Sequence, residues 1–256
     1  MKIGIIYCAY NCFSYVKESL YSFVEAKRQG LINEISAVSI PFIEYFDLNQ
    51  TKDGTTDFLV NLHEKNLIDQ VFTEPNYIQE HKARDLCLQY LKSTNCDIVW
   101  MVDGDEFYSI EDIKNIINFI NDNSNYYWYS INFKNYIFDG KQWIDGFCPP
   151  RIFRTKSDIL NIDKFYWDND IAYKDENAKI FNYKILDNLT IPKEITHIKH
   201  LTWLHQNGKL KYEYQIKHFG NCGYLWNYEK DQLEFNEDFY IKNNIKKPLI
   251  NIDKIT

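Results

Sequence analysis

The chain has 256 residues, 45% of them hydrophobic and 25% charged, and this length allows one large domain with a substantial core. Its formal net charge of −7 argues against general nucleic-acid binding, because neutralising a phosphate backbone needs clustered Lys and Arg. Aromatic residues make up 17%, so the second half could supply rings for sugar stacking or peptide binding as well as for a core.

Six cysteines are scattered without a paired C-x-x-C spacing, which indicates neither a zinc ribbon nor a dense disulfide framework. We therefore expect free thiols in a reducing cytoplasm. The N-terminal apolar run is too short for a signal peptide, and no stretch has the length needed to span a bilayer. These features predict a cytoplasmic protein without a transmembrane segment and leave the oligomeric state unknown.

The first 121 residues alternate between strand and helix patterns. We predict a buried strand over residues 2–9, a turn at Tyr10-Asn11, a helix from Phe13 that Gly30 ends, and a strand over residues 35–40. A strand–helix–strand unit of this length is parallel and right-handed in nearly all proteins. This half therefore indicates an open α/β sheet with helices on both faces.

A polar loop over residues 49–57 follows, and it predicts Asp57 as the N-cap of a helix that runs to about residue 65. A short strand over residues 67–72 and a helix over residues 78–91 come next. The polar face of the second helix carries Lys82 and Arg84, which either reach a ligand pocket or form a solvated surface.

The most informative stretch begins with the five apolar residues 98–102, which predict a strand buried on both faces. Asp103 and Asp105 follow, and in extended chain they point to one side, while Gly104 lets the backbone approach a ligand. Two such carboxylates repel each other unless a cation lies between them, which indicates a site for Mg²⁺ or Mn²⁺. The alternative is an acidic turn before the helix that Ser109 begins.

The second half predicts antiparallel additions to the sheet. Residues 126–133 alternate like a half-exposed strand, residues 138–141 resemble a hairpin turn, and residues 151–154 form another short strand. A helix over residues 209–219 follows three closely spaced histidines. We expect one domain over residues 1–256, with a nucleotide-binding half over 1–122, an acceptor-side half over 123–235 and a C-terminal tail over 236–256.

Several motifs together resemble the family 2 glycosyltransferases of the GT-A fold. In order, they are Tyr10-Asn11 after the first strand, Asp53-Gly54-Thr55-Thr56-Asp57, Lys82-Ala83-Arg84-Asp85, Val102-Asp103-Gly104-Asp105-Glu106 and Arg151-Ile152-Phe153-Arg154. Their order and spacing are moderately specific, although a D-x-D alone is common. Asp85 stands where Asn is usual, about a dozen residues separate the second strand from Asp53, and no ED or Q-x-x-R-W segment follows.

The resemblance implies a GT-A-type, Rossmann-like fold and transfer of a sugar, with inversion, from a nucleotide-sugar donor such as a UDP-sugar to an acceptor hydroxyl. The residues implied for donor binding are Tyr10, Asn11, Asp53, Lys82, Arg84, Asp103 and Gly104. The implied ligands of Mn²⁺ or Mg²⁺ are Asp103, Asp105 and His205, although a lone His is more often a hydrogen-bonded structural residue. Glu106 is interpreted as orienting the loop or a metal-bound water.

An inverting enzyme needs a carboxylate that takes the proton of the acceptor hydroxyl. The candidates are Asp145, Asp168 and Asp170, and the last two are favoured because Trp167 beside them suits a sugar acceptor. Two other functions remain open at this point. A nucleotidyltransferase would need a Gly-rich basic loop near the N-terminus, and a non-catalytic carbohydrate-binding protein would not need the aspartate pair.

Overall fold

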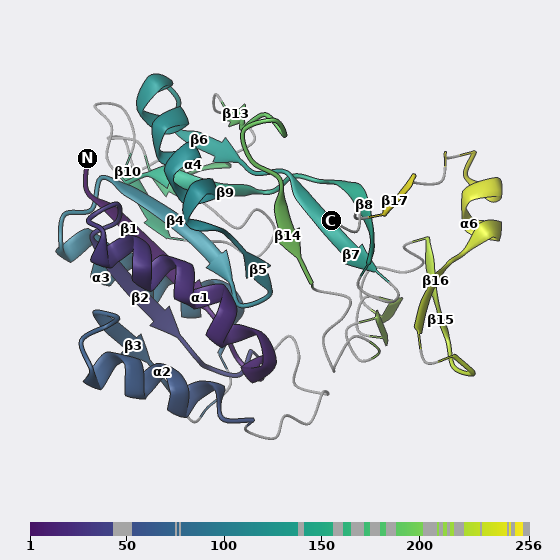
Figure 1. The fold of residues 1–256 in the computed structure, drawn as a ribbon, viewed down its shortest axis with the longest axis horizontal. Helices are drawn as coiled ribbons and strands as arrows, with labels where there is room; N and C mark the ends of the chain where they lie inside the picture. Colours follow the sequence, from purple (N-terminus) through teal and green to yellow (C-terminus); the bar gives the residue numbers. More distant parts are fainter. Residues whose placement is uncertain are drawn as a thin grey trace.

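The computed structural model describes residues 1–42, 53–74, 76, 78–137, 141–155, 161–164, 172–174, 180–182, 188–201, 209, 212–213, 216–217, 223–230, 232–244, 246 and 249–252. Its main element is a seven-stranded sheet with the order β13-β6-β9-β4-β1-β2-β3 (Figure 1). The bounds are β1 Ile3–Cys8, β2 Glu34–Val38, β3 Gln70–Phe72, β4 Ile98–Asp103, β6 Trp128–Ser130, β9 Pro150–Arg154 and β13 Asn188–Thr190.

Most of this sheet is parallel. β1 pairs in parallel with β2 and β4, β2 with β3, and β13 with β6. Only the two pairings of β9, with β4 and with β6, are antiparallel. The carboxyl ends of β1 and β4 therefore lie at the same edge, with Cys8 opposite Asp103.

Helices cover both faces because the strands of the sheet are apolar on both sides. Ile5 and Tyr7 of β1 belong to a core that also includes buried residues of α1 (Phe13–Arg28), α2 (Thr55–Glu64) and α4 (Ile110–Asp122). Ile6 and Cys8 pack instead with buried residues of α3 (Glu80–Ser93). The predicted α/β class, with helices on both faces of a mostly parallel sheet, is confirmed.

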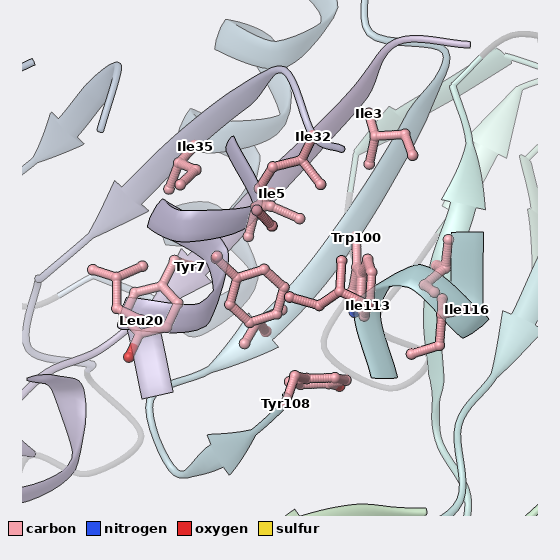
Figure 2. Packing of buried hydrophobic residues seen from close by; sticks show 14 of the residues in the cluster. Ile3, Ile5, Tyr7, Leu20, Ile32, Ile35, Trp100, Tyr108, Ile113 and Ile116 are labelled. Carbon is pink, nitrogen blue, oxygen red and sulfur yellow. The ribbon is translucent and has the colours of Figure 1, made fainter. Parts of the chain in front are cut away.

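The first core is aromatic at its centre (Figure 2). Trp100 of β4 contacts Phe23 edge to face, with ring centroids 5.5 Å apart, and contacts Tyr108 at 5.2 Å. Trp100 and Phe23 are fully buried. The packing of these rings fixes the position of β4 relative to α1 and to the segment that follows β4.

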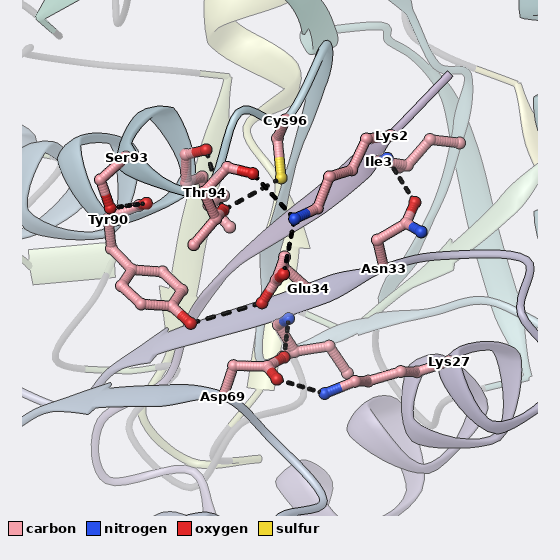
Figure 3. Close-up of polar contacts among 12 residues, drawn as sticks. Lys2, Ile3, Lys27, Asn33, Glu34, Asp69, Tyr90, Ser93, Thr94 and Cys96 are labelled. Carbon is pink, nitrogen blue, oxygen red and sulfur yellow. Dashed lines mark hydrogen bonds and ion pairs between the residues drawn. The ribbon is translucent and has the colours of Figure 1, made fainter.

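Polar contacts hold the opposite edge of the sheet together (Figure 3). Lys2 pairs with Glu34 at 2.8 Å and donates to the carbonyl of Thr94 at 2.8 Å. Asp69 accepts from the amide of Ile35 at 2.8 Å and pairs with Lys27 at 2.5 Å. These ion pairs and hydrogen bonds stabilise the amino ends of the first strands. The candidate site lies at the carboxyl ends.

A second sheet has the order β17-β8-β7-β14-β5. Its strands are β5 Glu106–Phe107, β7 Phe133–Ile137, β8 Gln142–Phe147, β14 Ile198–His200 and β17 Ile250–Ile252. The strand predicted over residues 126–133 is in fact two strands, since β6 belongs to the first sheet and β7 to the second. Residues 104–105 carry the chain from β4 in one sheet to β5 in the other.

Smaller elements complete the described part of the chain. They are a sheet of β10 (Asn161–Lys164), β11 (Ala172–Lys174) and β12 (Ile180–Asn182), a hairpin of β15 (Tyr224–Asn227) and β16 (Gln232–Phe235), and α6 (Glu237–Lys242). Residues 209, 212–213 and 216–217 are helical, within the helix predicted over 209–219. The predicted tail contributes α6 and, through β17, an antiparallel pairing with β8.

Five cysteines, Cys8, Cys12, Cys87, Cys96 and Cys148, are free thiols, and Cys222 lies outside the described residues. Within the described ranges, no helix combines the length and the hydropathy required to cross a bilayer.

The start of α4 is as predicted. Ser109 is its N-cap, and the Ser109 hydroxyl accepts from the amide of Asp112 at 3.0 Å while the carboxylate of Asp112 accepts from the amide of Ser109 at 2.9 Å. The predicted start of α2 is wrong, because Gly54 at φ +95° is the N-cap and Asp57 lies in the first turn. The left-handed backbone that glycine permits begins the helix earlier than the spacing predicts.

We predict that Ser109→Ala lowers the free energy of unfolding by about 1 kcal/mol, because it removes the side-chain partner of the Asp112 amide. Urea denaturation followed by circular dichroism measures this change. Ser14→Ala, an exposed serine in the first turn of α1, is the control and should change stability by less than about 0.5 kcal/mol. Equal stability of the two variants would contradict the capping role.

Candidate functional site

Asp103 ends β4, and two arginines hold its carboxylate. Arg84 of α3 approaches one oxygen, with Nη2 3.2 Å from Oδ1, and Arg151 of β9 approaches the other, with Nη2 2.9 Å from Oδ2. Both arginines are buried, at 6% and 5% exposure. The antiparallel pairing of β9 with β4 brings Arg151 to this strand end, so the first aspartate of the motif is fixed by ion pairs.

Arg151 also neutralises Glu106, which is completely buried. Arg151 Nη2 lies 2.5 Å from Glu106 Oε1, and the hydroxyl of Tyr108 donates to Glu106 Oε2 at 2.9 Å. Burial raises the pKa of Glu106 above its ordinary value, the charge of Arg151 opposes this rise, and the charges of Asp103 and Asp105 add to it. This environment agrees with the interpretation of Glu106 as a residue that orients the loop.

Gly104 lies where two loops meet. Its amide donates to the carbonyl of Cys8 at 2.8 Å, and a Cβ atom on it would lie 2.7 Å from Cys12 Sγ and 3.1 Å from the Cβ of Ala9. The sequence predicts that glycine is needed here for close approach to a ligand. In the structure, the close approach is to the segment that follows β1.

Asp105 lies beside His200 of β14. His200 Nε2 is 3.6 Å from Asp105 Oδ1, while His200 Nδ1 lies 2.7 Å from Oδ1 of Asn135. The ring stacks on Phe133 with centroids 5.0 Å apart. Because an amide oxygen only accepts, Nδ1 carries the proton in neutral His200, and Nε2 then presents its lone pair toward a carboxylate. A proton on Nε2 or a metal ion between the two groups makes this contact between acceptors favourable.

The carboxylate of Asp53 joins two loops near this site. It accepts from the amide of Phe13 at 2.8 Å and, through its other oxygen, from the amide and hydroxyl of Thr55 at 2.9 and 2.6 Å. The hydroxyl of Thr55 in turn accepts from the amide of Cys12 at 3.0 Å. Asp53 therefore organises the start of α1 and α2, and a nucleotide contact by this residue stays a prediction.

The remaining donor-binding candidates differ in exposure. Asn11 is buried and adopts φ +50°, Tyr10 is half-buried, and both follow β1. Lys82 is exposed in the first turn of α3, whereas Arg84 turns inward to Asp103 and to Glu80. The two cations predicted as a pair therefore lie in different environments.

Of the three base candidates, only Asp145 is in the described part of the chain. Its carboxylate is bound on both oxygens, with His197 Nε2 2.9 Å from Oδ1 and Lys193 Nζ 2.9 Å from Oδ2. Asp145 follows the buried Ile144 and contacts His197, which precedes the buried Ile198, so it lies on the face of the second sheet opposite His200. Asp168 and Asp170 lie outside the described residues.

The two aspartates among the predicted metal ligands have different partners. Asp103 pairs with arginines, Asp105 approaches His200, and His205 lies outside the described residues. In the part of the chain that the structure describes, no group of three or more His, Cys, Asp or Glu side chains could hold a metal ion. The motif therefore supplies one aspartate to an ion-pair cluster and the other to a carboxylate–imidazole pair.

The sequence does not indicate three residues as members of the site. Arg151 lies in a strand motif that gives it no role, and Asn135 lies in no motif. His200 is one of three histidines within nine residues, a cluster that signals a site without indicating which member contributes. Their roles depend on the pairing of β9, β7 and β14 with neighbouring strands.

We predict that Arg151→Met destabilises the protein by about 3–5 kcal/mol, because it leaves the carboxylate of the fully buried Glu106 without its counter-charge. Arg154→Met on the same strand is the matched control and should cost much less, since Arg154 binds a carbonyl and a tyrosine hydroxyl. Urea unfolding of Arg151→Met, Glu106→Gln and the double variant measures the coupling. Additive losses would contradict a direct interaction.

Comparison with solved structures gives the following likenesses. Staphylococcus aureus TarS matches with a TM-score of 0.48 and 17% identity, over 84% of this chain and 38% of TarS. TarS residues 1–349 in complex with UDP-GlcNAc matches with a TM-score of 0.41 and 20% identity, over 60% of this chain and 46% of that chain. GalNAc-T7 with UDP, GalNAc and Mn²⁺ matches with a TM-score of 0.40 and 12% identity, over 76% of this chain and 30% of that chain.

This chain therefore spans less than half the length of each of these proteins. All three TM-scores are below 0.5, and no identity exceeds 20%. No family model matches the sequence, and comparison with curated proteins finds no significant sequence match.

Proposed function

We propose that the protein is a cytoplasmic glycosyltransferase that moves a sugar from a nucleotide-sugar donor, a UDP-sugar, to an acceptor hydroxyl with inversion. The observation that carries this proposal is the loop of residues 103–105 at the carboxyl end of the parallel strand β4, with Asp105 facing Nε2 of His200. Open α/β sheets bind their ligands at the carboxyl ends of parallel strands.

The donor atoms at Asp105 fit a divalent cation. Ligands about 2.1 Å from a metal and at right angles to each other lie about 3 Å apart, which is close to the 3.6 Å between Asp105 Oδ1 and His200 Nε2. The contact between His200 Nδ1 and Asn135 is the hydrogen bond that metal-bound histidines make through their other ring nitrogen. We therefore propose Asp105 and His200 as ligands, with His200 in the role that the resemblance implies for His205.

An imidazole ligand favours Mn²⁺ over Mg²⁺. When bound, the ion would supply the positive charge that stabilises the departing nucleoside diphosphate. The chain's own contribution is to hold the Asp105 carboxylate in place. The carbonyl of Asp105 accepts from the amide of Leu201 at 2.9 Å, and the ion pairs of Asp103 fix the preceding turn of chain.

The charges of Arg84 and Arg151 are already paired with Asp103, Glu80 and Glu106. The exposed Lys82, near the start of the helix that carries Arg84, is therefore the cation better placed to contact an anionic diphosphate. Asn11, Tyr10, Asp53 and Gly104 are the proposed contacts to the nucleotide from the loops on either side.

The structure also bears on the choice of base. Lys193 Nζ and His197 Nε2 each lie 2.9 Å from an oxygen of Asp145, so an acceptor hydroxyl would have to displace one of them to reach this carboxylate. We therefore favour Asp168 or Asp170 for the base role. A non-catalytic carbohydrate-binding protein, the main alternative, would have no need of a buried ion-pair cluster beside a carboxylate–imidazole pair.

We predict that UDP binds with a Kd at least about tenfold lower in the presence of Mn²⁺ than in EDTA, and that Asp105→Asn or His200→Gln removes this difference. Isothermal titration calorimetry measures it. His197→Gln, on the other face of the same sheet region, is the control and should keep the metal effect. Metal-independent UDP binding, or an unchanged His200→Gln variant, would overturn the assignment of the ligands.

The base is tested separately by turnover. We predict that Asp168→Asn or Asp170→Asn lowers the rate of sugar transfer by about 100-fold or more while UDP binding is unchanged. Asp145→Asn should retain activity within about threefold because its charge is already paired. Release of UDP from a panel of UDP-sugars measures both effects, and full activity of Asp168→Asn and Asp170→Asn would return the role to Asp145 or another carboxylate.

A further inference from the structure

One face of the second sheet combines lysines with aromatic rings. Neighbouring residues in a strand point to opposite faces, and the buried Glu106, Asn135 and His200 lie on one side. Their neighbours Phe107, Lys134, Tyr136, Trp143 and Lys199 lie on the other, which we call the outer face. Figure 1 shows β5, β14, β7 and β8, which carry these residues, side by side.

The rings position the ammonium groups of both lysines. Lys199 Nζ lies 5.8 Å from the ring centroid of Phe107 and 5.2 Å from that of Tyr136. Lys134 Nζ lies 5.1 Å from the centroid of Trp143. These distances are within the range of cation–π attraction, so each charge is held over a ring on the outer face.

The two lysines lie directly opposite each other. Lys199 of β14 and Lys134 of β7 are register partners in the parallel pairing of these strands. Like charges at directly opposite positions destabilise a sheet. In the described ranges neither ammonium group pairs with a carboxylate, and Asp145 on the same face pairs with Lys193 and His197 instead. In a chain with net charge −7, this local excess of positive charge favours an anion from outside.

The outer face begins next to the proposed reaction centre. The ring of Tyr15 contacts Phe107 edge to face, with centroids 6.0 Å apart. Phe107 follows Asp105 by two residues, so this end of the outer face lies close to Asp105 along the chain. A ligand on the outer face would therefore extend from Phe107 across Lys199 toward Lys134 and Trp143.

We propose that the outer face binds an anionic carbohydrate, whose phosphate or carboxylate groups pair with Lys134 and Lys199 while its sugar rings contact Phe107 and Trp143. Its role as the acceptor rests on the glycosyltransferase function proposed above. Neutral sugars would use only the rings, whereas an anionic sugar also relieves the repulsion between the two lysines. The charge of a carbohydrate, as well as stacking of its rings, would thus determine whether it binds as the acceptor.

The test measures binding of three probes in the absence of donor: maltotetraose, maltotetraose phosphate and tetragalacturonic acid. We expect at least one anionic probe to bind about 3–10-fold tighter than the neutral one at low salt, with the gain decreasing as ionic strength rises. Lys134→Gln/Lys199→Gln should abolish this gain. Lys209→Gln/Lys230→Gln, which removes the same charge near the β15–β16 hairpin, should retain it.

The two anionic probes distinguish phosphate from carboxylate recognition. Equal affinity for all three probes, or an undiminished gain in Lys134→Gln/Lys199→Gln, would overturn the proposal. Titration of UDP into the same variants separates it from the proposed function, because both lysines lie outside the proposed donor site and UDP affinity should not change. A wild-type protein that binds UDP normally but shows no preference for the anionic probes would refute the acceptor surface alone.

Discussion

The end of the central strand depends on the guanidinium of Arg151, which lies between the carboxylates of Asp103 and Glu106. Removing these charges from water costs several kcal/mol for each ion, and close ion pairs with added hydrogen bonds are needed to offset that cost. Tyr108 and Arg84 supply those contacts from the segment after β5 and from α3. Any change in one member therefore disturbs the loop that carries Gly104 and Asp105.

The same cluster connects the two sheets. Arg151 belongs to the seven-stranded sheet, Glu106 to the five-stranded sheet, and the guanidinium carbon of Arg151 lies 5.5 Å from the ring centroid of Phe133 in β7. Phe133 in turn stacks on His200. The position of His200 beside Asp105 thus depends on packing and ion pairs that begin at the buried arginine, so the carboxylate–imidazole pair is held by both sheets.

Much of the first half of the fold follows from local patterns. The buried strand over residues 98–102, the helix that Ser109 begins and the need for glycine at position 104 were all predicted from the sequence. These features depend on neighbouring residues and on local backbone geometry. Both can be inferred from a short stretch of sequence. Even so, the close contact of Gly104 is with Cys12 and Ala9, which only the parallel pairing of β1 with β4 brings near.

The remainder of the site depends on long-range register. The interaction of Arg151 with Asp103 requires β9 to run antiparallel to β4, and the choice among three histidines depends on His200 lying opposite Glu106. A shift of one residue in β14 would turn His200 to the outer face and Lys199 inward. The Asp53 carboxylate joins two loops through Phe13 and Thr55, and composition does not encode a tertiary contact of this kind.

The central claim is that Asp105 and His200 together bind a divalent cation in the presence of a nucleoside diphosphate. Electron spin-echo envelope modulation of the Mn²⁺–UDP complex tests it directly, because a directly bound imidazole gives a ¹⁴N modulation. The account predicts this signal in the wild-type protein and in His205→Gln, and its loss in His200→Gln. A signal that persists in His200→Gln, or a wild-type protein that binds UDP without Mn²⁺, would contradict it.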